Sequence, residues 1–315
     1  MHILHLDGEW DLRQTGKNES IKATVPGTVH TDLLSAGKIP DPYYRDNEDS
    51  LQWIGETDWI YSRKFIITTE FLANKQIILR CEGLDTLATI KINSREIART
   101  DNMFRTYEFD VKQALKSGTN TIEIRFDSTI PYIRKRQTEH PVPLRSGPHT
   151  ISGGNWVRKE QCNYGWDWGP CLLTCGIWRP IMLIACDTAR IAEISVRQKH
   201  RKSGEVTLDI QADIAGAGTG KSVTAEVLIS RNGKSVISGK TRFRNGRAKI
   251  RLVIEKPELW WPNGMGEQPL YEVEVNLLDD RGNQLDTERK RIGLRTLRLQ
   301  RKKDRWGECF RFRSI

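Results

Sequence analysis

The stretch Leu87-Ala88-Thr89-Ile90-Lys91-Ile92 alternates apolar and polar side chains from Ala88 onward. Successive side chains of a β-strand point to opposite faces, so this period of two predicts a strand with one buried face. Further strand-like runs lie at 76–81, 120–126, 206–212, 223–229, 248–254 and 270–275. Turn signals separate several of them, namely Asn93-Ser94, Asn232-Gly233 and Asn245-Gly246, because Asn and Gly accept the positive φ of tight hairpins. The chain is therefore predicted to be all-β.

The length of 315 residues suits about two domains. Short strands at about ten-residue spacing predict an immunoglobulin-like β-sandwich over 187–295. The preceding 186 residues are too many for such a sandwich, and a jelly-roll β-sandwich with long loops fits them. Two short helices are expected, one over 32–36 capped by Thr31 and one over 111–116 capped by Asp110.

A long stretch from Pro131 to Pro170 is predicted to be a loop, and loops of this size tend to be functional. It ends in NWVRKEQCNYGWDWGP, residues 155–170, which places three of the ten tryptophans within thirteen residues. An indole face beside a carboxylate suits a sugar, because the apolar face of a pyranose stacks on the ring while charged groups bind its hydroxyls. The motif therefore predicts carbohydrate binding.

Catalysis by the motif itself is a separate hypothesis. A retaining glycosidase needs two carboxyl groups about 5–5.5 Å apart, one of them with a raised pKa. Within the motif only Glu160 and Asp167 could form such a pair, and the sequence does not fix their separation. We therefore favour a binding role for the motif over a catalytic one.

The net charge of +10 suggests nucleic-acid binding as a hypothesis to be weighed. Residues 289–315 hold eleven Lys or Arg and two acids, which leaves about +1 on the other 288 residues. A charge excess confined to one terminal segment differs from a basic groove built across a fold. We expect no nucleic-acid partner, and a nucleic-acid binder that uses this basic segment is kept as a lesser alternative.

The cysteines also exclude some classes of protein. Cys81, Cys162, Cys171, Cys175, Cys186 and Cys309 lack the close C-x2-C pairs of structural zinc sites. Free thiols are expected rather than a metal site or a disulfide, and no cofactor is expected. No apolar run approaches the roughly 18 residues of a membrane span, and the first residues do not resemble a signal peptide. A cytoplasmic location without a membrane partner follows as the expectation.

Three parts of the motif region resemble the N-terminal domain of β-mannosidases of glycoside hydrolase family 2. These parts are Trp156 to Cys162, Trp166-Asp167-Trp168-Gly169-Pro170 and Gly176-Ile177-Trp178. Other agreeing stretches are 25–34, 59–65, 83–86 and 100–105. The similarity covers essentially the whole chain. Galactosidase-like and glucuronidase-like members of the family resemble the fold but lack the Arg-Lys-Glu-Gln and Trp-Asp-Trp-Gly pieces.

The resemblance implies a galactose-binding-like jelly roll over 1–186 and an immunoglobulin-like sandwich over 187–295. Residues 296–315 would begin the linker or strand into a (β/α)8 barrel. A barrel of about 250 residues does not fit in this chain, and the family's two catalytic glutamates lie on the barrel. We therefore expect the non-catalytic region of a retaining exo-β-mannosidase, which hydrolyses terminal β-D-mannose. This chain alone should be inactive. The expected partners are a β-mannoside oligosaccharide and the catalytic barrel of the same parent chain.

The resemblance also assigns substrate-binding roles. Asp167 would accept hydrogen bonds from sugar hydroxyls, while Arg158 and Trp166 would shape the pocket; no residue is assigned to catalysis or to metal binding. For Arg158 the alternative is an ion pair with Glu160 or Asp167 that only holds the loop. Trp156, Trp168 and Trp178 are expected to pack rather than to stack on sugar. An alternative function is a stand-alone carbohydrate-binding protein whose whole site is this loop.

Overall fold

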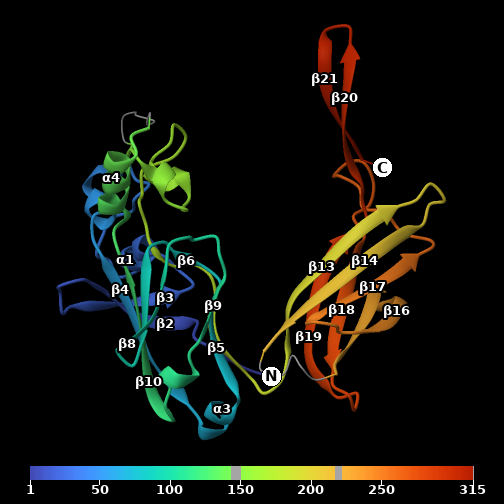
Figure 1. The fold of residues 1–315 in the computed structure, drawn as a ribbon. Helices are drawn as coiled ribbons and strands as arrows, with labels where there is room; N and C mark the ends of the chain where they lie inside the picture. The colour runs from blue at the N-terminus through green and yellow to red at the C-terminus, as the bar shows by residue number, and fades with distance from the viewer. Residues whose placement is uncertain (143–149, 217–221, 315) are drawn as a thin grey trace. The chain divides into compact units, whose positions relative to one another are not determined.

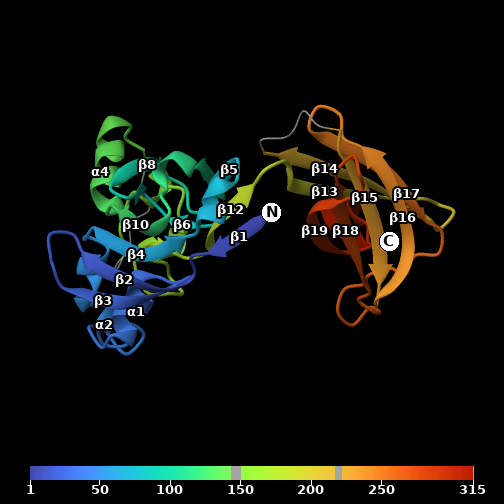
Figure 2. The same cartoon turned by 90° about the horizontal axis from the view of Figure 1, so that it is seen from below.

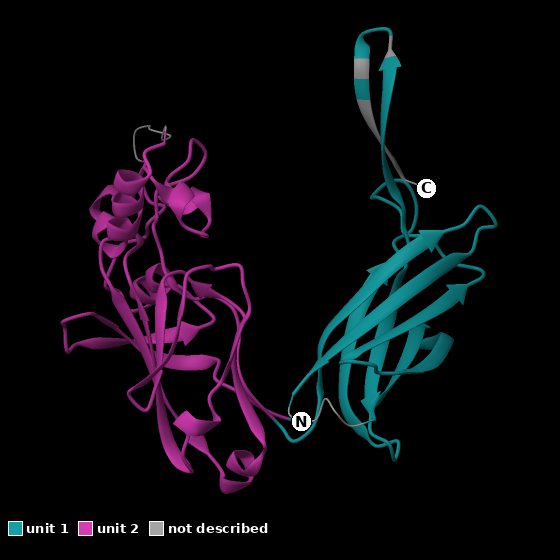
Figure 3. Cartoon of the chain, viewed as in Figure 1, with its two compact units in different colours: residues 1, 186–315 teal, residues 2–185 magenta. Residues whose placement is uncertain are grey.

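The computed structural model describes residues 1–142, 150–216 and 222–314 (Figure 1). The chain divides into two compact units, residues 2–185 and residue 1 with 186–315 (Figure 3). Strands account for 49% and helices for 14% of the structure, and the sheets are antiparallel, which confirms the all-β prediction.

The unit of residues 2–185 is a β-sandwich of a six-stranded and a four-stranded sheet. The larger sheet has the order β3 (Ser20–Val25), β2 (Gly8–Gln14), β4 (Trp59–Ile67), β10 (Gly118–Phe126), β7 (Ala88–Ile92), β8 (Arg95–Thr100). The smaller has the order β1 (His2–His5), β12 (Ile181–Cys186), β5 (Gln76–Cys81), β9 (Tyr107–Asp110). A short pair joins β6 (Leu84–Asp85) to β11 (Gly176–Ile177). In Figure 2 strands β3, β2, β4 and β10 follow one another in this order.

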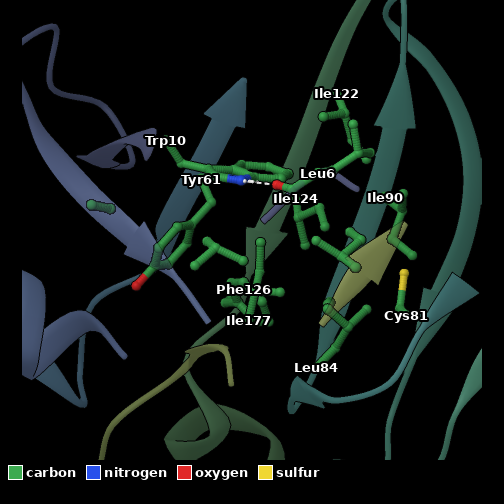
Figure 4. Close-up of a cluster of buried hydrophobic side chains, with 14 of the residues drawn as sticks. Leu6, Trp10, Tyr61, Cys81, Leu84, Ile90, Ile122, Ile124, Phe126 and Ile177 are labelled. Atoms are coloured by element: carbon green, nitrogen blue, oxygen red, sulfur yellow. Dashed lines mark hydrogen bonds between the residues drawn. The ribbon is translucent and has the colours of Figure 1, made fainter. Parts of the chain in front are cut away.

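The core of this unit lies between the two sheets, and Figure 4 shows part of it. Ile122, Ile124 and Phe126 alternate along β10 and are fully buried, as the period of two requires. The Trp10 indole is also buried, and its Nε1–H donates to the Leu6 carbonyl at 2.7 Å, which satisfies its one polar atom.

Helices cover little of this unit. They are α1 (Val29–Ser35), α2 (Asn47–Ser50), α3 (Thr69–Ala73) and α4 (Thr129–Glu139), with 3-10 turns η1 (Gln52–Ile54), η2 (Lys112–Ala114), η3 (Gly154–Trp156) and η4 (Gln161–Tyr164). The prediction of an α-helix over 111–116 is wrong in type, since only the short turn η2 forms there. None of the helices in the described residues is long and apolar enough to cross a membrane.

Two further predictions need correction, one of a helix and one of a loop. Helix α1 begins three residues earlier than expected, and its N-cap is Thr28 instead of Thr31. Thr31 lies in the first turn of the helix, where its hydroxyl accepts a hydrogen bond from the Thr28 N–H at 3.1 Å. Helix α4 occupies the first part of the stretch predicted to be a loop. Pro131 is the third residue of α4, where the missing N–H costs nothing because the first turn has no intrahelical acceptor for it.

The second unit forms an immunoglobulin-like sandwich of a three-stranded and a four-stranded sheet. Its strands are β13 (Arg190–His200), β14 (Val206–Ala215) and β17 (Arg247–Ile254) in one sheet, and β16 (Lys234–Arg242), β15 (Thr224–Arg231), β18 (Leu270–Leu278) and β19 (Gln284–Gly293) in the other. Asn232-Gly233 and Asn245-Gly246 turn with positive φ at both residues, as predicted. A separate hairpin pairs β20 (Leu297–Asp304) with β21 (Gly307–Ser314).

All six cysteines are free thiols, as expected. Cys81, Cys171 and Cys186 are buried, and the other three are half-buried. Burial raises the pKa of the Cys171 thiol to about 11, which keeps it protonated at neutral pH.

Candidate functional site

The Trp-rich motif rests on a small hydrophobic core of its own. Its members come from α4, from the motif and from the residues that flank the motif, namely Ile130, Ile133, Val157, Tyr164 and Leu173, with Ile151 and Trp156 packed against them. The Tyr164 hydroxyl donates to the Thr129 hydroxyl at 2.8 Å, which ties the motif to the first turn of α4. Burial raises the pKa of Tyr164 to about 12, so this donor stays protonated at neutral pH. Helix α4 therefore holds the motif in place through hydrophobic packing and a hydrogen bond.

Residues 157–160 alternate between buried and exposed side chains. Val157 and Lys159 are buried, while Arg158 and Glu160 face solvent. Lys159 is 3% exposed, and its ammonium forms an ion pair with the Asp85 carboxylate, which also accepts from the Thr86 hydroxyl. Removing either partner of such a buried pair leaves an uncompensated charge in a low dielectric. The ion pair thus fixes the motif to β6, which lies 74 residues away in the sequence.

Arg158 is held by its backbone. Its carbonyl accepts from the Met103 N–H at 3.0 Å, and the residue forms an isolated parallel bridge with Asn102. Its side chain is exposed and forms no ion pair with Glu160 or Asp167 among the described residues. The alternative in which Arg158 only holds the loop through such a pair is therefore wrong. The exposed guanidinium is available to a ligand.

Asp167 and Trp168 form the tip of a tight turn. Trp166 and Gly169 are bridged on either side of them, and Gly165 enters the turn at φ +94°, a conformation that favours glycine. The Asp167 carboxylate is exposed and makes no hydrogen bond or ion pair with the described residues. The turn therefore exposes the carboxylate of the residue that separates Trp166 from Trp168 in the sequence, and the centroids of those two indole rings lie 6.2 Å apart.

The tryptophans divide into two groups, and one prediction fails. Trp156 packs on the small core, and its Nε1–H donates to Gln137 at 2.8 Å. Trp178 is half-buried, and its Nε1–H donates to the Met103 carbonyl at 3.1 Å. Both pack as predicted. Trp168 is 72% exposed, so its predicted packing role is wrong: the turn carries its ring away from the small core.

The hypothesis of a catalytic pair finds no support in the geometry of the motif. Glu160 and Asp167 are both exposed, and no hydrogen bond in the described part of the chain joins them. Among the described carboxyl groups a raised pKa is found for Asp32 and Asp127, in each case because of burial. Asp32 accepts from the Tyr61 hydroxyl at 2.8 Å, and Asp127 pairs with Arg125 at 2.8 Å. Both carboxyls are engaged in structural contacts.

Sequence reasoning missed the burial of two polar residues, Lys159 within the motif and His30 on α1. His30 lies on α1 and is 7% exposed, and its imidazole makes no hydrogen bond with the described residues. Burial, followed by the positive charge of Lys159, lowers the His30 pKa to about 4, so the ring is neutral at neutral pH. Its place in the amphipathic run from Val29 to Leu34 gave no signal that sets it apart from an ordinary surface histidine.

Comparison with known families fits both units. Residues 10–179 match the glycosyl hydrolase 2 galactose-binding domain-like family, and residues 189–295 match glycosyl hydrolases family 2. The chain therefore belongs to glycosyl hydrolase family 2.

Its relatives are β-mannosidases. The chain is 35% identical over 295 residues to β-mannosidase B of Emericella nidulans, which covers 92% of this chain and 34% of that protein. It is 30% identical over 314 residues to β-mannosidase of Bos taurus, covering 94% and 35%. The β-D-mannosidase of Dictyoglomus thermophilum matches all of this chain and 39% of its own, with a TM-score of 0.92 and 39% identity. The chain spans about a third of the length of the curated relatives, and the resemblance read from the motif is confirmed.

Proposed function

We propose that this chain is the non-catalytic N-terminal region of a retaining exo-β-mannosidase and that its Trp166–Gly169 turn binds the substrate. Asp167 accepts hydrogen bonds from the hydroxyls of the terminal mannose, and Arg158 and Trp166 shape the pocket around that sugar. The names of the relatives supply the substrate class, and they favour an enzyme region over a stand-alone carbohydrate-binding protein.

One observation carries the binding role. The base of the motif is held by a buried ion pair and a small core, yet its tip exposes Asp167 and Trp168 without protein partners for the carboxylate. A preorganised binding site requires exposed ligand-binding side chains on a backbone that buried contacts hold in place.

The chemistry itself we assign to the rest of the parent chain. Hydrolysis with retention needs a carboxylic acid and a carboxylate facing one glycosidic bond. The two carboxyls with raised pKa in the described residues, Asp32 and Asp127, are occupied by Tyr61 and Arg125. We expect the purified chain not to hydrolyse a chromogenic β-mannoside. Turnover that persists through purification and disappears in an Asp167→Asn variant would contradict this division of labour.

The binding role is tested by titrating the chain with methyl β-D-mannopyranoside and following the indole N–H signals by NMR. The Trp166 signal should move, and Asp167→Asn should weaken binding by about tenfold, since the sugar hydroxyl then donates to a neutral amide oxygen instead of a carboxylate. Asp280→Asn removes an exposed carboxylate from a turn of the other unit and serves as the matched control. Equal affinities for the two variants would remove Asp167 from the site.

A further inference from the structure

The segment that carries Arg158 is attached to a loop far away in the sequence, the one that joins β8 to β9. Asn102 in this loop forms a parallel bridge with Arg158, and the Met103 N–H donates to the Arg158 carbonyl at 3.0 Å. A parallel ladder continues with a bond in the other direction, which here would run from the Glu160 N–H to the Met103 carbonyl. In the described residues both of these groups have a different partner.

Met103 satisfies the Glu160 N–H with its sulfur. The Met103 carbonyl accepts the Trp178 indole N–H at 3.1 Å, and the Glu160 N–H donates to the Met103 Sδ at 3.2 Å. Met103 is 2% exposed. A purely apolar side chain in its place would leave the Glu160 N–H facing a group that cannot accept a hydrogen bond, which costs free energy. One buried residue therefore contacts both Arg158 and Glu160.

Trp178 is itself held in place, so the Met103 carbonyl is not available to Glu160. A Cβ atom on Gly83 would lie 2.5 Å from the Trp178 Nε1, so only glycine allows the indole to lie this close to the backbone before β6. On the ring, the guanidinium carbon of Arg179 lies 4.2 Å from the indole centroid. The indole keeps the Met103 carbonyl occupied, and the Glu160 N–H depends on the sulfur.

The direction of the Arg158 side chain depends on these backbone contacts. Its guanidinium is exposed and forms no hydrogen bond or ion pair with the described residues. The next side chain, that of Lys159, points inward to its pair with Asp85. Side chains alternate along an extended segment, so a backbone rotation that moves Arg158 also moves Lys159. The two Met103 bonds lie on either side of Lys159 and oppose that rotation.

We propose that Met103 is a positioning residue for β-mannoside binding: its N–H and its sulfur hold residues 158–160 so that Arg158 faces the sugar. The inference rests on the proposed function, because it assigns Met103 an effect that acts through Arg158. A thioether suits this position, since it is apolar enough to be buried and still accepts a weak hydrogen bond. Leucine has a similar size and no acceptor, so Met103→Leu separates the two properties.

The test measures the affinity for methyl β-D-mannopyranoside by NMR, from the Trp166 indole N–H signal. Met103→Leu should weaken binding by about three- to tenfold, while the melting temperature falls by no more than a few degrees. The matched control is Met182→Leu on β12, a half-buried methionine whose sulfur accepts no hydrogen bond from the described residues; it should leave the affinity unchanged. Selenomethionine at all four methionines keeps an acceptor of similar size and should also preserve the affinity.

A double-mutant cycle separates positioning from a general structural role. Arg158→Ala alone should weaken binding by about tenfold, and Met103→Leu should add less than about twofold in that background. If the full loss from Met103→Leu persists when Arg158 is already absent, Met103 supports the fold of the motif as a whole, and the inference is overturned.

The backbone amide of Glu160 gives a readout that needs no sugar. In the wild-type chain this N–H should exchange slowly with solvent, because the Met103 sulfur accepts it. In Met103→Leu its exchange should accelerate by about fivefold or more, while the Trp178 indole N–H stays protected. Fast exchange of the Glu160 amide in the wild type, or equal rates in the two chains, would show that the sulfur does not hold residues 158–160.

The outcomes separate this inference from the proposed function. If the wild type binds the sugar and Met103→Leu binds it equally well, the role of Met103 is overturned and the proposed function stands. If Arg158→Ala keeps the wild-type affinity, the roles of Arg158 and Met103 both fail, and that of Asp167 stands where Asp167→Asn weakens binding. A wild-type chain that gives no response to the sugar overturns both.

Discussion

The Trp-rich motif and the surface of the three-stranded sheet in the sandwich place their charged side chains in opposite ways. On the sandwich, Asp209 pairs with Lys199 at 3.1 Å and with Arg251 at 2.7 Å, and all three side chains lie on the surface of β13, β14 and β17. In the motif the Lys159 charge is buried, whereas the Trp168 ring is 72% exposed. These exposed pairs follow the rule that charges lie at the surface, whereas the motif buries a charge and exposes an indole ring. Such departures concentrate at functional sites.

The largest expected effect comes from breaking the buried pair. Lys159→Met leaves the Asp85 carboxylate without its counter-charge and should destabilise the unit by about 3–5 kcal/mol, measured by urea unfolding. Lys199→Met on the sandwich breaks an exposed pair and should cost less than about 1 kcal/mol. Adding Asp85→Leu to Lys159→Met should recover most of the loss, since no charge then remains buried. Equal costs for the two single variants would remove the contrast between the two regions.

An intermediate effect is expected from pH, through His30. Its pKa is near 6.5 in the unfolded chain and about 4 in the folded one, because of burial and the Lys159 charge. The folded state therefore binds fewer protons between these values, and its stability is full above pH 6.5 and falls as the pH drops toward 4. The loss attributable to His30 amounts to about 3 kcal/mol at most.

Urea unfolding at a series of pH values from 7 to 4.5 measures how the free energy of unfolding depends on pH. His30→Gln should flatten it in the unit of residues 2–185, since no titrating group remains at that position. His2→Gln changes an exposed histidine on β1 and should keep the wild-type profile. A slope that survives in His30→Gln would assign the pH dependence to the carboxyl groups instead.

The smallest effect on stability is expected at the tip of the motif. Asp167→Ala removes a carboxylate without partners in the described structure, so the free energy of unfolding should change by no more than about 0.5 kcal/mol. Binding of the β-mannoside should weaken in the same variant. A loss of stability above about 1 kcal/mol would show that the carboxylate supports the turn. The tip of the motif would then have a structural role.

The sequence predictions are more accurate for the sandwich than for the motif. The predicted strands of the sandwich reappear as β14, β15, β17 and β18, because one buried face imposes a local period of two. Helix α4 was missed because Pro131 was read as a loop signal, although proline fits the first turn of a helix. Inside the motif, the presence of three tryptophans predicted carbohydrate binding but did not show which ring would stay exposed.

The sequence by itself determined the all-β class, the hairpin turns, and the family that the Arg-Lys-Glu-Gln and Trp-Asp-Trp-Gly pieces indicate. Only the tertiary structure decided that Lys159 turns inward and Arg158 outward, that Trp156 packs and Trp168 does not, and that His30 is buried. The physical reason is the distance along the sequence over which each kind of interaction acts. Strand period and turn chemistry act over two to four residues, whereas the burial of Lys159 depends on Asp85, 74 residues away, and the pKa of His30 depends in part on Lys159, more than a hundred residues further along the chain.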